Sequence, residues 1–291
     1  MDVSIIIPWK GEEDCLNTTL ESLYKAKNTV DYEIVIVSNF NQGKSYPVLD
    51  LKKERNVDIR VISGDNLSIG QARNLGATYA RGDYLFFGDD HLMFSDYSLD
   101  NLVINLQLSN GNCITPAIED TATGIIGYGG TFNKSLDYIW ISKSLLPIEE
   151  VLLAPGYGIL MKKSFFEELG GFNESFLKYG VEDYEFSLRL WFLGYRLVVD
   201  SETTLKHSPI VDNLYKVSHS ELIYNYLTLG YLLFDEDSFS RVLELFRTNH
   251  HFNNALSLLM EGNSLMEDRK NNIQYKTIED KKLFDKFLVI F

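Results

Sequence analysis

The chain has 291 residues, of which 45% are hydrophobic, and a formal net charge of −14. This length and composition suffice for one large domain with a buried core, or for such a domain with an appendage. The acidic balance argues against nucleic-acid binding through phosphate contacts and against docking on an anionic membrane. An anionic substrate stays compatible with this charge if a metal ion supplies the positive field.

Two cysteines, Cys15 and Cys113, are present without any C-x-x-C pair. This excludes a cysteine-based zinc site, and we expect two reduced thiols. The first residues contain neither a basic segment nor a long apolar segment, and no window approaches the ~20 apolar residues that span a bilayer. We therefore expect a cytoplasmic protein with no signal peptide and no transmembrane segment.

The first ninety residues alternate predicted strands and helices. Continuous apolar runs predict strands buried on both faces, and apolar residues at helical spacing predict helices. The expected strands are 3–9, 32–40, 57–63 and 83–88, and the expected helices are 12–26 and 68–80, the latter with Ser68 as its N-cap. This order predicts an α/β fold with a doubly wound, mostly parallel sheet.

The rest of the chain is less regular. Short strands and glycine-rich turns are expected over 112–142, a strand and a helix ending at Gly170-Gly171 over 152–172, and a helix ending at Gly194 followed by a strand over 181–199. From about residue 215 the spacing is helical. We predict a domain over 1–214, divided into halves 1–91 and 92–214, and a helical extension 215–291 packed on it and able to form a homo-oligomer contact.

The candidate functional residues cluster where predicted elements begin or end. Asp89-Asp90-His91 follows a buried strand, at the sheet edge where α/β proteins bind ligands, and offers oxygen and imidazole ligands for a divalent cation. Such a run is also common in solvated turns. Glu182 and Asp183 open a helix, where acids can simply complement the helix dipole, and Glu185 and Arg189 are spaced to pair on that helix. His207 follows a strand, and a lone histidine is more often structural than a metal ligand.

Five segments in order carry a family resemblance. They are "VSIIIPW", "DNLSIGQARNLGATYARGDYLFFGDDH", "GYGILMKKSFFEELGGFNESF", "VEDYEFSLRLWFLGYRL" and "KHSP". Over about residues 1–210 the chain resembles the GT-A-fold glycosyltransferases of the family-2 type. The run from Glu182 to Arg189 is similar to the equivalent helix of chondroitin-polymerase-like and polypeptide GalNAc-transferase-like enzymes.

The resemblance implies site residues. Asp89 and His91 match the D-x-D metal motif in a D-x-H form, and with His207 they would hold Mn²⁺ or Mg²⁺. Asp183 matches the general base of inverting members, with Glu182 beside it at the donor or acceptor. The residues implied for nucleotide-sugar binding are Pro8, Trp9, Asn39, Arg73, Asn74, Asp89 and Asp90.

Two departures from the family pattern bear on the nucleotide. The acid that usually follows the second strand is absent from "VSNFN", although Asn39 could accept a bond from a pyrimidine N–H. Trp9-Lys10 replaces the usual pair after the first strand. Trp9 could stack on a base or lie in the core, and Lys10 could touch phosphate or be a surface lysine.

The resemblance predicts a metal-dependent hexosyl- or N-acetylhexosaminyl-transferase that moves a sugar from a UDP-linked donor to a hydroxyl of a glycan or other acceptor. The retaining GalNAc-transferases usually carry an amide where this chain has Asp183, so inversion is expected. The segment 127–135 and the C-terminal helices are expected to shape the acceptor side. The alternatives are a non-catalytic GT-A subunit and a nucleotidyltransferase, and the latter lacks the expected glycine-rich, basic loop after the first strand.

Overall fold

The computed structural model describes residues 1–10, 13–39, 57–208, 216–262 and 265–291. The strands are β1 (Val3–Trp9), β2 (Tyr32–Ser38), β3 (Asp58–Ser63), β4 (Tyr84–Phe87), β5 (Leu92–Met93), β6 (Cys113–Asp120), β7 (Ile126–Gly127), β8 (Gly130–Phe132), β9 (Tyr138–Trp140), β10 (Ile148–Glu150), β11 (Ile159–Lys162) and β12 (Leu197–His207). The helices are α1 (Glu13–Lys25), α3 (Ile69–Tyr79), α4 (Ser98–Leu108), α5 (Lys163–Glu168), α6 (Glu182–Phe192), α7 (His219–Leu233), α8 (Glu236–Phe246), α9 (Phe252–Glu261), α10 (Leu265–Gln274) and α11 (Asp280–Lys286).

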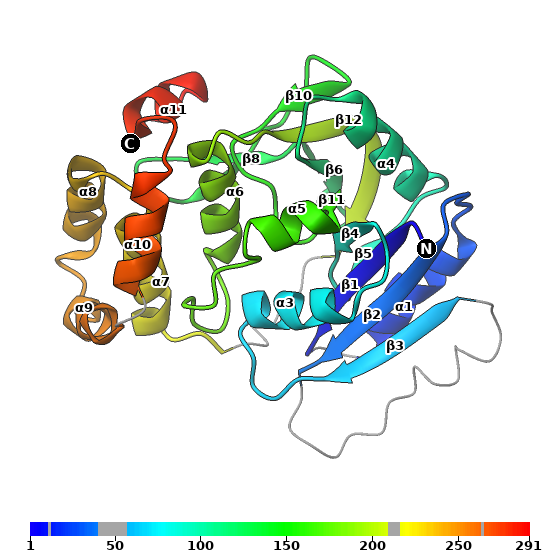
Figure 1. Ribbon diagram of the computed structural model, residues 1–291, viewed down its shortest axis with the longest axis horizontal. Coiled ribbons are helices and arrows are strands. Elements are labelled where there is room, and N and C mark those ends of the chain that lie inside the picture. The colour runs from blue at the N-terminus through cyan, green and yellow to red at the C-terminus, as the bar shows by residue number, and fades with distance from the viewer. Residues whose placement is uncertain (11–12, 40–56, 209–215, 263–264) are drawn as a thin grey trace.

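A mixed α/β architecture is observed, as the sequence predicts (Figure 1). The main sheet has the order β10-β12-β6-β11-β4-β1-β2-β3. The four strands predicted in the first ninety residues lie side by side and are parallel. Strand β11 is antiparallel to both of its neighbours, so it separates this parallel half from the parallel pair of β6 and β12.

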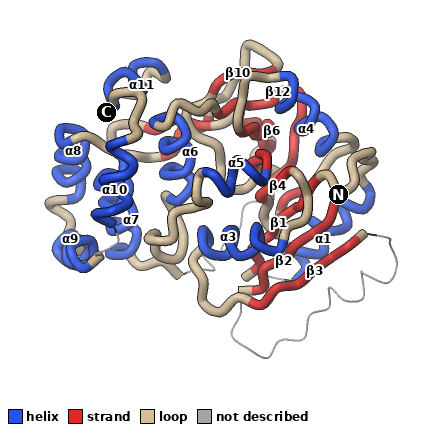
Figure 2. Tube along the Cα trace, in the orientation of Figure 1, coloured by secondary structure: helices blue, strands red, loops and turns tan. Residues whose placement is uncertain are grey.

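Helices cover both faces of the sheet, which explains why the central strands are apolar on both sides (Figure 2). All seven residues of β1 are buried. Its odd-numbered residues Val3, Ile5 and Ile7 pack with α1 and α4. On the opposite face, Ile6 shares a second buried cluster with residues of α3, α5 and α6.

Helix α3 begins as predicted. The Ser68 hydroxyl accepts the backbone N–H of Gln71, and the Gln71 side chain accepts the N–H of Ser68, so the two form a capping box. This cap fixes the start of the helix that carries Arg73 and Asn74.

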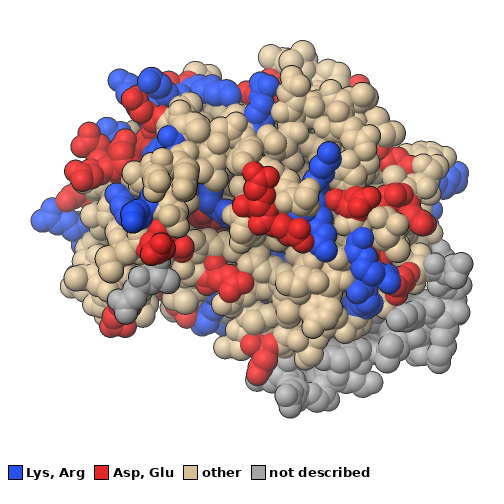
Figure 3. All heavy atoms as spheres, in the orientation of Figure 1, with Lys and Arg blue, Asp and Glu red and all other residues tan. Residues whose placement is uncertain are grey.

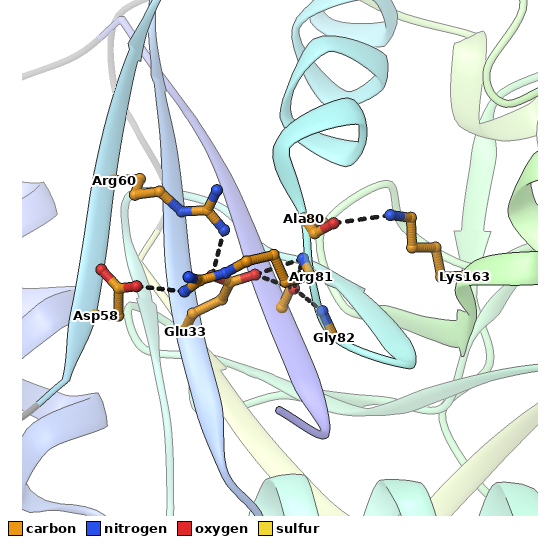
Figure 4. Close-up of polar contacts among 8 residues, drawn as sticks. Glu33, Asp58, Arg60, Ala80, Arg81, Gly82 and Lys163 are labelled. Atoms are coloured by element: carbon orange, nitrogen blue, oxygen red, sulfur yellow. Dashed lines mark hydrogen bonds and ion pairs between the residues drawn. The ribbon is translucent and has the colours of Figure 1, made fainter.

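A buried carboxylate holds the amino ends of the central strands, opposite the carboxyl ends that carry the candidate ligands (Figure 4). Glu33 on β2 is fully buried and accepts hydrogen bonds from the Ser4 hydroxyl at 2.7 Å and from the Arg81 backbone N–H at 2.6 Å. The Arg81 guanidinium binds both Glu33 and Asp58, and Arg60 also pairs with Glu33. Burial alone would raise the pKa of Glu33, but these hydrogen bonds lower it to about 2.

The C-terminal helices pack on the main domain at the end of the molecule away from β3 (Figure 1). Helix α7 lies against α6, and residues of α7, α8, α9 and α11 belong to the same buried cluster as α6. Within the described ranges, no helix is both long and apolar enough to cross a membrane. On the face drawn in Figure 3, acidic and basic side chains are interspersed, so the net negative charge forms no single patch there.

Candidate active site

Three candidate ligands meet at the carboxyl end of the sheet because a two-residue strand joins them. Asp89 and His91 follow β4, and His207 is the last residue of β12 rather than lying beyond it. Strand β5 pairs antiparallel with the end of β12, in the register that sets His207 opposite Leu92. The Ser208 N–H also donates to the His91 carbonyl at 3.1 Å. Residues far apart in the sequence thereby become neighbours.

The ligand atoms of Asp89, His91 and His207 all lie within 4.8 Å of one another. The His91 Nε2 atom is 3.4 Å from Asp89 Oδ2, and the two imidazole rings are 4.3 Å apart at their centroids. One carboxylate oxygen and two imidazole nitrogens form a mixed set that suits a first-row divalent cation better than Mg²⁺, which prefers oxygen ligands only.

Asp90 orients this group from a buried position. Its carboxylate lies 2.7 Å from His91 Nδ1, and the residue is 3% exposed. Burial alone would lower the pKa of His91, but the bond to Asp90 and the charges of Asp89 and Asp90 raise it. Because Nδ1 donates to Asp90, Nε2 is the nitrogen turned toward Asp89, as in carboxylate–histidine–metal arrangements.

His207 carries a buried nitrogen whose lone pair is available to a metal ion. Its Nε2 atom has no hydrogen-bond partner among the described residues. Burial and the neighbouring His91 lower the pKa of His207 to about 3, so its imidazole is neutral at neutral pH. The Tyr157 ring stacks on the imidazole at 4.0 Å and 10° and fixes its plane. A neutral imidazole whose buried Nε2 has no hydrogen-bond partner among the described residues fits a metal ligand.

The second acidic cluster lies at the start of α6, after a strained turn. Val181, the N-cap residue, has a φ of 77°, in the left-handed region that β-branched residues rarely adopt. Asp183 accepts the backbone N–H of Tyr184 at 3.0 Å and of Gly156 at 3.3 Å. Burial, and then the charge of Glu182, raise the pKa of Asp183 to about 7.

Arg73 pairs with the acidic cluster. It lies on α3, is 3% exposed, and donates to Glu182 at 2.9 Å, while the other Glu182 oxygen accepts the Gly180 N–H at 2.8 Å. Its positive charge lowers the pKa of both Asp89 and Asp183, although burial raises each of them by more. The Arg73 side chain therefore links the two clusters into one site.

The loop before β11 completes this site. A Cβ at Gly156 would lie within 3 Å of the Arg73 guanidinium, so any other residue there would displace the Arg73 side chain from its place beside Glu182. The charges of Asp89 and Asp183 both contribute to raising the pKa of Tyr157, after burial as the main cause. Tyr157 therefore lies near both acids.

The other predicted nucleotide-binding residues have structural contacts. Pro8 pairs with Val37 in the sheet, and Trp9 is 4% exposed in the apolar cluster beneath α1. Asn39 donates to the Leu67 carbonyl at 2.7 Å and accepts the Leu67 N–H at 2.8 Å. These bonds leave one lone pair on the Asn39 oxygen, and the roles of these residues in nucleotide binding stay predictions.

Asn74 fastens the loop after α5. Its Nδ2 donates to the Phe172 carbonyl and to Glu174, and its oxygen accepts the Phe172 N–H, each at 2.9 Å.

The predicted pairing on α6 is confirmed, since Arg189 Nε donates to Glu185 at 2.6 Å and both side chains are buried.

Sequence reasoning missed strand β5, the orienting role of Asp90 and the place of Tyr157. Tyr157 lies in the "GYG" of the third segment that carries the family resemblance. Its stacking on His207 becomes visible only in the structure, where β12 pairs with β5.

Comparison with known proteins identifies the family. The model described as "Glycosyl transferase family 2" matches residues 4–170, and the model described as "N-terminal domain of galactosyltransferase" matches residues 154–220. The chain is 28% identical over 220 residues to "Probable N-acetylgalactosaminyltransferase 6" of Caenorhabditis elegans, covering 67% of this chain and 35% of that protein. It is 28% identical over 221 residues to "O-antigen biosynthesis protein RfbC" of Myxococcus xanthus, covering 70% of this chain and 17% of that protein.

Two solved structures share the fold. GalNAc-T7, crystallised with UDP, GalNAc and Mn²⁺, superposes with a TM-score of 0.80 at 18% identity, covering 99% of this chain and 56% of that chain. S. aureus TarS 1–349 in complex with UDP superposes with a TM-score of 0.62 at 16% identity, covering 94% and 89%. The fold is therefore the expected GT-A fold, and because the family model matches more than half of its residues, this chain belongs to glycosyl transferase family 2.

Proposed function

We propose that this chain is a metal-dependent glycosyltransferase that moves a sugar from a UDP-linked donor to an acceptor hydroxyl, with inversion at the anomeric carbon. The observation that carries the proposal is the convergence of Asp89, His91 and His207, in which the buried Nε2 of His207 lacks a partner among the described residues. The chain spans only 35% of the C. elegans relative, so the activity of the whole protein is part of this proposal.

The metal ligands would be Asp89, His91 and His207, with Asp90 holding His91. Because the ligand set contains nitrogen, we propose Mn²⁺ as the divalent cation. When bound, it would act as a Lewis acid and neutralise the charge that develops on the leaving diphosphate. The mixed donor set and the neutral His207 imidazole support this assignment.

Asp183 is proposed as the general base. As the acceptor oxygen attacks the anomeric carbon, its proton passes to an Asp183 carboxylate oxygen, and the bond between the anomeric carbon and the diphosphate oxygen breaks. A base works best when its pKa lies near the working pH. Burial and the neighbouring Glu182 place the pKa of Asp183 at about 7, which supports this role.

The UDP assignment rests on the structural neighbours. The GalNAc-T7 structure contains UDP and Mn²⁺, and TarS was solved with UDP and with UDP-GlcNAc. We therefore propose UDP as the nucleotide of the donor for this chain, and we propose no particular sugar or acceptor.

Metal dependence tests the proposal directly. We expect EDTA to abolish transfer and Mn²⁺ to restore it. The variant His207→Ala should weaken Mn²⁺-supported UDP binding by at least about tenfold, as loss of metal-site residues typically does, with an unchanged unfolding midpoint. The exposed His250 provides the matched control, so His250→Ala should bind UDP normally. Full transfer in chelator would refute the three-ligand site, and unfolding of His207→Ala would make His207 a core residue instead.

A further inference from the structure

Helix α7 reaches the acidic cluster through one buried amide. Asn225 is fully buried, and its side-chain oxygen accepts the Leu177 N–H at 2.8 Å. Its Nδ2 donates to the carbonyls of Leu177 and Gly180, each at 2.9 Å. One side chain from the C-terminal helices thus satisfies backbone hydrogen-bonding groups of residues 177–180, as a neighbouring strand would do.

The backbone that Asn225 holds is the strained turn before Asp183. Lys178, Gly180 and Val181 all have positive φ values, of 52°, 100° and 77°. A non-glycine residue in this region costs of order 1–3 kcal/mol and persists only where its surroundings determine the conformation. On α6, Glu182 accepts the Gly180 N–H at 2.8 Å, but the N-cap residue Val181 makes no side-chain cap bond and the carbonyls of Leu177 and Gly180 are held from α7.

Helix α7 makes two further contacts, one with this turn and one with the residues just before it. The Tyr224 hydroxyl donates to the Ser175 carbonyl at 3.1 Å, and Glu221 pairs with Lys178 at 2.9 Å. From the other side, the Ile69 N–H at the start of α3 donates to the Lys178 carbonyl at 2.7 Å. Of these contacts, those of Asn225 are the most buried and reach closest to Asp183 along the chain.

We propose that Asn225 is a positioning residue for sugar transfer, which holds the 177–180 backbone, with Lys178 and Gly180 at positive φ, in the conformation that presents Asp183 to the acceptor. The C-terminal helices are then part of the catalytic unit, since one of them sets the place of the base. This inference rests on the proposed role of Asp183. It acts on the base and leaves the metal and diphosphate side of the site, on β4 and β12, untouched.

The test variant is Asn225→Asp, which keeps the size and the oxygen that accepts the Leu177 N–H but turns a second acceptor oxygen toward two carbonyls. We expect kcat to fall about 10- to 100-fold, because a displacement of about 1 Å at a reacting group can cost about 100-fold. The Kd for UDP with Mn²⁺ should stay within about twofold. Asn225→Ser, which removes the amide and adds no charge, is the second variant should the first not fold.

Thr228→Val is the matched control, since Thr228 is fully buried on the same helix and bonds none of the 177–180 backbone in the described structure. It should keep kcat within about twofold. Three outcomes would each overturn the proposal. The first is folded Asn225 variants with a normal kcat, and the second is unfolding of both variants. The third is a loss of kcat that matches an equal loss in the number of UDP-binding sites. Asp183→Asn, assayed in parallel, separates the two claims: its full activity refutes the base, whereas its inactivity beside normal Asn225 variants refutes only the positioning role.

Discussion

At the scale of single residues, Asp183 carries the chemistry that is proposed for this chain. Its carboxyl has a pKa raised to about 7, so it is protonated below pH 7 and available as a base above it. The charged groups that act on it are Glu182 and Arg73. The phenols whose pKa values respond to its charge are Tyr138, Tyr157, Tyr179, Tyr184 and Tyr226. We expect kcat to rise with pH through an apparent pKa near 7, measured with saturating donor.

The substitution Asp183→Asn keeps the shape of the side chain and removes its basicity. Transfer should fall by about 10²–10⁴-fold, the usual contribution of a general base, while UDP affinity changes little. Asp137→Asn, which alters an exposed acid of the nearby β8–β9 connection, is the control and should retain activity. Weakened donor binding with near-normal turnover would instead make Asp183 a binding residue. A product with the donor's anomeric configuration, seen by NMR, would remove it from the role of base.

At the scale of elements, Glu33 joins the amino ends of β1, β2 and β3 to the start of β4. Its pKa of about 2 lies below the ordinary value of 4.5, so its carboxylate stabilises the fold fully above pH 4.5, and this stabilisation is lost as the pH falls toward 2. Removing one partner of a buried ion pair costs about 3–5 kcal/mol. Because the Arg81 side chain is 51% exposed, we expect Glu33→Gln to lower the free energy of unfolding by roughly 2–3 kcal/mol.

Urea denaturation at pH 7 and pH 3 measures this effect. Asp58→Asn is the matched control, since Asp58 also binds Arg81 but is partly exposed, and a surface pair contributes about 0–1 kcal/mol. Equal losses in both variants, or a Glu33→Gln deficit of the same size at both pH values, would show that the buried carboxylate is not the source of stability.

The same scale shows what the sequence could predict. Uninterrupted apolar runs placed β1 to β4 within two residues of their observed ends, because a strand buried on both faces leaves a local pattern. The same pattern placed Asp89 and His91 just beyond the carboxyl end of β4, where the structure has them. The two residues of β5 leave no such pattern, and the pairing that brings His207 to His91 depends on register between distant segments. The contacts of Asn225 with Leu177 and Gly180 also join distant segments, so the sequence does not predict them. In the sequence, Asn225 is only a polar residue within a helix.

At the scale of the whole molecule, the predicted division at residue 214 stays a prediction, but its two sides share one core. Leu227 and Phe234 of the C-terminal region belong to the same buried cluster as Phe186 of α6. The Phe192 carbonyl at the end of α6 also accepts the Thr277 N–H at 2.6 Å. Ligand binding near α6 should therefore stabilise the C-terminal helices together with the sheet, in one cooperative transition.

Thermal unfolding with nucleotides tests both this coupling and the identity of the donor. A ligand that binds only the folded chain at 100 times its Kd adds about 2.7 kcal/mol. For a chain of this size that corresponds to a rise of roughly 5 °C in the midpoint. We expect the full rise with UDP and Mn²⁺ together, a smaller one with GDP or ADP and Mn²⁺, and loss of the Mn²⁺-dependent part in His207→Ala but not in His250→Ala. Two separate transitions, of which UDP moves only one, would contradict a shared core. A larger shift with GDP than with UDP would refute the uridine assignment and leave the fold and the metal ligands as they stand.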